Sequence, residues 1–255
     1  MKLYFAGAEN LIHYNLLKEC SVKKFLESYY LLWWRSPNLT KGDDLLLDSW
    51  AFTAYYKDIQ IDIETYCDYI KRHNIQNYAC LDVIWNGEKT ALNQKEMEWL
   101  WLSPIPTFHV WEKKEFFEEM VHKYPYIGLW WMVPYARNWK IIDGFLSYCF
   151  SYIMKNKLKT KCHWRWMTNP KFMKKFPFYS VDSTGRLAPQ KFNRMVLFKW
   201  GELQGFTSQD MRKKFWIDFW KLHYKERNKI SIKAYLEFED YVTKLHQTKG
   251  MEYRL

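Results

Sequence analysis

Short apolar runs alternate with longer amphipathic segments along most of the chain. The apolar runs predict seven strands, at residues 3–6, 45–47, 78–84, 105–110, 126–129, 160–163 and 178–181, with an eighth at 194–199. The amphipathic segments predict helices at residues 22–32, 63–73, 93–100, 114–123 and 141–157. Regular alternation of strand and helix is typical of parallel strands joined by crossover helices.

Seven or eight such units predict an α/β fold, a TIM-type (β/α)8 barrel, rather than an open sheet. Neither a G-x-G-x-x-G nor a P-loop pattern occurs, which argues against a dinucleotide or nucleoside-triphosphate fold. We expect the barrel domain at residues 1–204 and a helical, basic C-terminal extension at residues 205–255. No apolar run approaches the ~18 residues of a membrane-spanning helix, and the N-terminus does not resemble a signal peptide. We therefore expect a cytoplasmic protein with no membrane partner.

Tryptophan and glycine have unusual frequencies, with 15 Trp and only 9 Gly among 255 residues. Eleven of the tryptophans lie mostly just after short apolar runs, where a chain turns: Trp33, Trp34, Trp50, Trp85, Trp99, Trp101, Trp111, Trp130, Trp131, Trp164 and Trp166. Glycine is expected at such places because it alone adopts positive φ freely. We hypothesise that these positions are glycine in the living protein, and that UGA codons were translated under the wrong genetic code. The competing explanation is a core rich in aromatic residues.

The net charge is +11, and much of the excess lies in residues 155–175 and 212–233, interleaved with aromatic residues. Such segments are typical of surfaces that bind nucleic acid, although each alone also fits a solvated helix face. The five cysteines are widely spaced and form no CxxC pattern, so we expect free thiols and no metal site.

Carboxylates and histidines mark the ends of five predicted strands. Asp48, Asp82 and Asp182 end three of them, and His109 and His163 end two others. Barrel enzymes carry their reactive groups at this end of the strands. One aspartate alone would fit a helix cap or an Asx turn. Three on one rim are harder to explain in that way, and two of them permit displacement at a sugar carbon, with one carboxylate attacking and the other handling the proton of the leaving group. The third could accept hydrogen bonds from the N–H edge of a purine.

Five motifs between residues 45 and 185 resemble one enzyme family. With Trp50 taken as glycine, residues 46–53 resemble the D-S-G-G-F-Q signature of the tRNA-guanine transglycosylases. The likeness is closer still to their short, often phage-borne relatives, which insert 7-deazaguanine bases into nucleic acid. With the local tryptophans taken as glycine, residues 126–132 and 163–168 resemble the family's two glycine-rich strand ends. Residues 79–84 and 178–184 resemble its base-recognition and nucleophile strands.

The resemblance implies a pentosyltransferase that exchanges guanine for a 7-deazaguanine-type base. Asp182 would attack C1′ of the target nucleotide, Asp48 would act as general acid and base, and Asp82 would read the purine edge. Further substrate-binding positions that we assign on the same grounds are Ser49, Phe52, Trp130, Trp131, Met132 and His163. The implied partners are a nucleic acid, a free purine or 7-deazapurine base and a second copy of the chain. No cofactor is implied, and a phage-encoded protein would act in the host cytoplasm.

Two departures from the family leave alternatives open. The tRNA enzymes carry a C-terminal zinc site of three cysteines and a histidine, which this sequence lacks. Specificity for tRNA therefore does not transfer, and DNA is an equal candidate. Indoles at positions 50, 130 and 131 would fill the base pocket, so the alternative is a catalytically inactive barrel that binds nucleic acid by stacking and phosphate contacts. A barrel hydrolase acting on small nucleosides is a third candidate.

Overall fold

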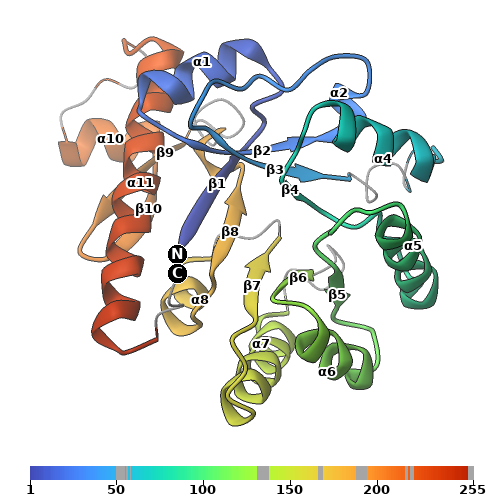
Figure 1. Cartoon of the computed structure of the whole chain (residues 1–255). Helices are drawn as coiled ribbons and strands as arrows, with labels where there is room; N and C mark the ends of the chain where they lie inside the picture. The colour runs from blue at the N-terminus through green and yellow to red at the C-terminus, as the bar shows by residue number, and fades with distance from the viewer. Residues whose placement is uncertain are drawn as a thin grey trace.

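A single curved sheet of parallel strands organises the molecule (Figure 1). The structure, a computed structural model, describes residues 1–49, 55, 57, 59–130, 138–165, 169–187, 194–215, 218 and 221–251, with residues 186 and 215 described by their backbone alone. Within these residues the sheet has eight strands, in the order β4-β3-β2-β1-β8-β7-β6-β5. Their bounds are β1 (Lys2–Ala6), β2 (Lys24–Ser28), β3 (Asp44–Asp48), β4 (Asn77–Tyr78), β5 (Thr107–His109), β6 (Tyr126–Trp130), β7 (Lys161–Trp164) and β8 (Ser180–Ser183).

The two ends of the sheet meet, which makes the fold a barrel. β4 and β5 are joined by a parallel bridge between Ala79 and Ile105, and the Cys80 amide donates to the Ile105 carbonyl at 2.9 Å. The predicted (β/α)8 fold is therefore confirmed. Aliphatic and tyrosine side chains fill the interior, among them Leu26 and Tyr4.

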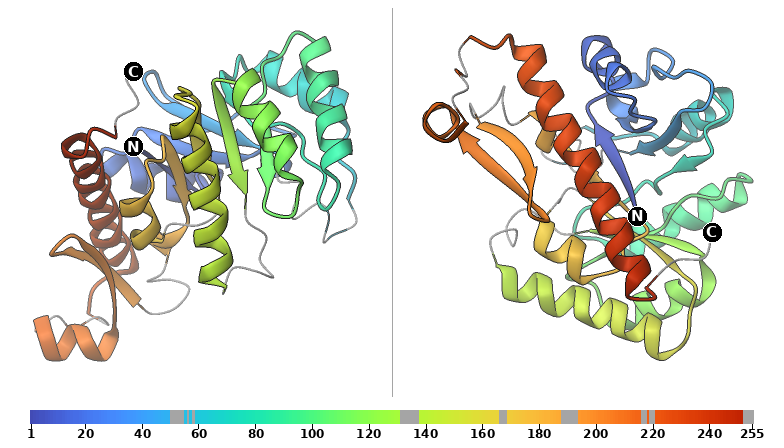
Figure 2. Two further views of the ribbon diagram at one scale, coloured as in Figure 1. Left: turned by 90° about the horizontal axis from the view of Figure 1, so that it is seen from below. Right: turned by 90° about the vertical axis from the view of Figure 1, so that its left-hand side faces the viewer.

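Helices cover the outside of the sheet (Figure 2). They are α1 (Leu11–Glu19), α2 (Tyr29–Leu32), α4 (Ile63–Arg72), α5 (Gly87–Trp99), α6 (Lys114–Lys123), α7 (Trp139–Lys155) and α8 (Pro170–Lys175). Several begin at a side chain that caps free backbone amides: Asn10 before α1, Asp62 before α4 and Asn86 before α5. The predicted helices at 63–73, 93–100, 114–123 and 141–157 are confirmed, and α5 begins six residues earlier than predicted.

The predicted helix at residues 22–32 is wrong in its first part, which contains strand β2, whereas its last four residues are helical as α2. Phe25 packs in the core between the sheet and the helices, whereas its neighbour Leu26 points into the barrel. A strand buried on both faces reads as a continuous apolar run, and periodicity does not separate it from a buried helix.

The predicted eighth strand at residues 194–199 forms, but outside the barrel. Strand β9 (Arg194–Lys199) pairs antiparallel with β10 (Glu202–Thr207) in a separate two-stranded sheet. The hairpin is closed by Trp200 and Gly201, both with positive φ. The expected domain boundary after residue 204 falls inside β10, and α10 (Ser208–Phe215) and α11 (Tyr224–Thr248) follow it. Figures 1 and 2 show the hairpin, α10 and α11 gathered on one side of the barrel.

Helix α11 packs directly on the first barrel strand. Glu239 of α11 accepts a hydrogen bond from the Leu3 amide at 2.9 Å and pairs with Lys24 of β2 at 2.9 Å. Phe238 and Val242 of the same helix are fully buried in the core cluster that contains Leu3. In the part of the chain that the structure describes, no helix is long and apolar enough to cross a membrane.

Candidate active site

The sheet brings the three predicted aspartates to the carboxyl ends of their strands. Asp48 is the last residue of β3, Asp82 follows β4, and Asp182 lies near the end of β8. All three are almost completely buried, with exposed fractions of 6%, 3% and 2%. A buried carboxylate is costly unless a cation or hydrogen-bond donors stabilise it. The partners of these three aspartates therefore determine what the site can do.

Arg165 is the cation that lies among the aspartates. Its Nη1 donates to Asp48 Oδ1 at 3.0 Å and lies 3.9 Å from Asp82 Oδ1. Burial acts to lower the pKa of Arg165, but the charges of Asp48, Asp82 and Asp182 outweigh burial and raise it. The guanidinium stays charged and joins the two aspartates electrostatically. We did not predict a role for Arg165; its place two residues after His163, on the same face of the strand, was the available signal.

Asp82 is the centre of a second set of contacts. Ser49 Oγ donates to Asp82 Oδ1 at 3.0 Å, and His109 Nε2 lies 3.4 Å from Asp82 Oδ2. On the other side of its ring, His109 Nδ1 lies 2.8 Å from Glu112 Oε1. Burial would raise the pKa of Asp82, but the contact with His109 and the charge of Arg165 prevail and lower it.

The pKa of His109 shifts in the opposite direction. Burial acts to lower the pKa of this histidine, but Asp82 and Glu112 on its two nitrogens prevail and raise it. The site therefore contains an aspartate of lowered pKa in contact with a histidine of raised pKa, and both side chains are buried. Both ring nitrogens of His109 are engaged, so the capacity left at this pair is that of the Asp82 carboxylate to accept further hydrogen bonds.

His163 stands beside Asp182, the predicted nucleophile. Its Nε2 lies 3.4 Å from Asp182 Oδ1, and its Nδ1 lies 2.7 Å from Ser180 Oγ, which in turn contacts the Tyr126 hydroxyl at 2.6 Å. Burial lowers the pKa of His163, and the opposing effect of Asp182 does not cancel it. A neutral imidazole can fix the orientation of the Asp182 carboxylate without neutralising its charge.

Trp130 occupies the space next to His109. The indole, at the end of β6, is 3% exposed and packs with Ile84 and Trp111. Its ring centroid lies 5.1 Å from that of His109, and Trp111 stacks on the same imidazole at 4.6 Å. The backbone position that the resemblance assigns to base contact thus carries a large, buried aromatic ring.

Several predicted positions lie outside the described residues: Phe52, Trp131 and Met132, together with Trp50 and Trp166. Among the side chains that the structure does describe, no group of three or more His, Cys, Asp or Glu could hold a metal ion. None of the five cysteines forms a disulfide, and all five are buried.

The tryptophans fall into two structural groups. Trp85, Trp101 and Trp200 have φ values of 64°, 65° and 50°, in the left-handed region that favours glycine. Trp101, just after the end of α5, is 95% exposed. Trp164, by contrast, is 1% exposed and stacks on Phe178 at 4.9 Å. Backbone conformation therefore favours glycine at some of these positions, whereas the indole of Trp164 fills the core.

Comparisons with known proteins place the chain in no family: no protein-family model and no curated protein matches it. Among solved structures it is similar to the tryptophan synthase subunit alpha from Campylobacter jejuni. The two share 13% sequence identity and a TM-score of 0.47, over 71% of this chain and 85% of that one. A likeness this weak has no bearing on function.

Proposed function

We propose that the chain is a pentosyltransferase that exchanges guanine for a 7-deazaguanine-type base in tRNA or DNA. One observation carries the proposal. The resemblance assigns three roles to aspartates: nucleophile, acid–base group and reader of the base. All three aspartates are buried at strand ends, and the charge of each raises the pKa of Arg165. They come from three separate strands, so their gathering is a property of the fold rather than of one local motif.

In the first half of the reaction, the Asp182 carboxylate attacks C1′ of the target nucleotide. The bond from C1′ to guanine N9 breaks, its electron pair goes to the base, and an ester forms between Asp182 and C1′. His163 Nε2 lies 3.4 Å from Asp182 Oδ1, without a formed hydrogen bond, and would orient the attacking carboxylate if the two atoms moved closer on substrate binding. In the second half, N9 of the incoming base attacks C1′ and Asp182 leaves as a carboxylate.

Asp48 handles the proton in both halves. It protonates the departing guanine and then takes the proton from the incoming base, so the exchange is neutral overall. Its ion pair with Arg165, at 3.0 Å, favours the carboxylate form. Donation to guanine therefore requires that this contact weaken when the substrate binds and that Asp48 take up one proton from solvent, which the incoming base returns to it in the second half.

We also propose that residue 130 is glycine in the naturally produced protein. An indole and a purine are both fused five- and six-membered rings. Glycine at 130 would leave a slot of purine shape beside His109, which contacts Asp82. The positive φ values of Trp85, Trp101 and Trp200 support the same exchange at those positions. A peptide mass spectrum of the natural protein over residues 126–134 tests it directly.

The alternative is an inactive barrel that binds nucleic acid through its basic surface. The buried indole of Trp130 favours it, because that ring occupies the place of the base. The net charge of +11 fits both proposals equally.

Covalent trapping separates the two. The full chain, with tryptophan or glycine at positions 130 and 131, is incubated with guanine-containing tRNA and DNA and resolved under denaturing conditions. An enzyme gives a covalent adduct, and Asp182→Asn abolishes it. The control variant is Asp143→Asn, at an aspartate on α7 that pairs with Lys175, and it should still form the adduct. If every form binds nucleic acid and none gives an adduct, the inactive barrel is correct. Release of free base from nucleosides, without exchange into polymer, would instead indicate a hydrolase.

A further inference from the structure

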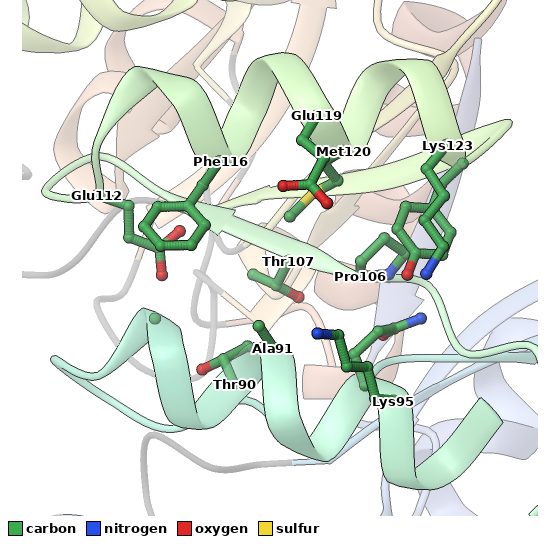
Figure 3. Close-up of a pocket in the computed structure, with 13 residues that line it drawn as sticks. Thr90, Ala91, Lys95, Pro106, Thr107, Glu112, Phe116, Glu119, Met120 and Lys123 are labelled. Carbon is green, nitrogen blue, oxygen red and sulfur yellow. The ribbon is translucent and has the colours of Figure 1, made fainter. Parts of the chain in front are cut away.

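A groove lies between α5 and α6, over strand β5 (Figure 3). It encloses about 150 Å³. That is room for a few water molecules or for one small organic molecule. Ala91, Phe116 and Met120 provide apolar walls.

Two polar side chains of this groove have buried atoms without a hydrogen-bond partner among the described residues. Gln94 is 4% exposed; its amide nitrogen donates to Glu98 and Pro104, but its Oε1 has no partner. Thr107 is 1% exposed, and its Oγ1 also has none. Since an unsatisfied buried polar atom is unfavourable, a bound molecule that donates hydrogen bonds here would stabilise the fold.

Two opposite charges face the groove from its two helices. Lys95 on α5 and Glu119 on α6 point toward it from opposite sides (Figure 3). Both residues are solvent-exposed, and neither makes an ion pair within the described part of the chain. The other two charged lining residues are engaged: Lys123 pairs with Glu98 at 3.1 Å, and Glu112 contacts His109.

We propose that this groove binds a free α-amino acid with an uncharged side chain. The carboxylate of the ligand pairs with Lys95, and its ammonium group donates to Glu119. The free oxygens of Gln94 and Thr107 accept the two remaining ammonium protons. The ligand side chain packs on Phe116 and Met120. A zwitterion fits because the unpaired charges of the groove are one cation and one anion.

The groove is joined to the candidate active site through Glu112. This residue lines the groove, and its carboxylate accepts from the His109 amide at 3.0 Å and contacts the His109 ring. His109 in turn contacts Asp82. A ligand beside Glu112 should therefore perturb the His109 imidazole whether or not the barrel is an enzyme, so the inference does not depend on the proposed function.

Calorimetric titration of the full chain with L-leucine, L-methionine and L-glutamine tests the proposal. We expect saturable binding of at least one, with a dissociation constant on the order of 1 mM for so small a ligand. Lys95→Gln and Glu119→Gln should each weaken binding roughly tenfold. Ala91→Met, which fills the groove, should abolish it. Lys89→Gln and Glu115→Gln on the same two helices, outside the groove, should leave it unchanged.

A second readout is the imidazole NMR signal of His109, which should move on saturation and stay still in Ala91→Met. The proposal is overturned if none of the three amino acids binds at millimolar concentration, leaving solvent alone in the groove. It is equally overturned if the N-acetyl amides bind as well as the free amino acids, or if the groove variants bind like the wild type.

Discussion

Glu27 of β2 provides a sharp test of the packing around the barrel. The side chain is fully buried, and neither carboxyl oxygen has a hydrogen-bond partner among the described residues. Burial, together with the negative charge of Glu9, raises the pKa of Glu27 from 4.5 to about 8. The backbone of Asn38 and the charge of Arg35 oppose this rise without cancelling it. Glu27 should therefore be protonated in the folded protein at neutral pH.

This shift fixes the sign and size of a pH effect on stability. A group whose pKa is raised by folding contributes stability that is complete below its unfolded pKa, here about 4.5. That contribution is lost as the pH rises through the folded value of about 8. At about 1.4 kcal/mol for each pKa unit, the full loss is about 5 kcal/mol. Water that reaches the ionised carboxylate reduces this loss, so we expect a loss of about 3–5 kcal/mol in the free energy of unfolding. That is a large part of the ~5–15 kcal/mol by which a typical domain is stable.

Glu27→Gln removes the titration and nearly preserves the shape. Urea unfolding at pH 5 and pH 9 should show that the wild type loses about 3–5 kcal/mol more than the variant over this range. The variant should be the more stable protein at pH 9. Glu64→Gln, at an exposed position on α4, is the control and should follow the wild type. Equal pH dependence in wild type and Glu27→Gln would refute the reasoning.

Three further changes test other parts of the structure. Trp101→Gly should raise the free energy of unfolding by about 1 kcal/mol, because the φ of 65° at this position disfavours a side chain. Trp99→Gly, within α5, should lower it by about as much, because glycine disfavours the helix. Urea unfolding measures both changes. Gly87→Ala would place a Cβ 2.5 Å from the carboxylate that holds His109, so the pKa of His109 should fall in an NMR titration; an unchanged pKa would contradict that contact. Arg165→Met should destabilise the fold by about 3–5 kcal/mol at pH 7, because buried aspartates lose their cation, and less at pH 4; a loss that is the same at both pH values would argue against the ion pair.

The sequence predicts those parts of the fold that depend on local pattern. The strand ends at Asp48, Asp82 and Asp182 could be recognised from short apolar runs, and a parallel barrel then requires them to share one rim. Strand β2 was missed because Phe25 and Leu26 are both apolar and face opposite sides of the sheet.

The partners of the aspartates were beyond the reach of sequence reasoning. Arg165 and Asp48 are 117 residues apart in sequence, and only the closure of the barrel brings them to 3.0 Å. Glu112 lies three residues after His109, but the sequence alone does not show that the two side chains are in contact. Which charged side chains pair with each other in the site can therefore be read only from the three-dimensional structure.

The packing of α11 on β1 has a consequence for how the protein is made. The Leu3 amide and Glu239 are 236 residues apart, and β1 also pairs with β8. At the ~5–20 residues per second of protein synthesis, on the order of 10–50 s pass between the appearance of β1 and that of its covering helix. During that interval the strand has an open edge and an uncovered apolar face, which are the features that chaperones bind and that aggregation exploits. Strand β1 therefore leaves the ribosome well before the strand and the helix that complete its native surroundings.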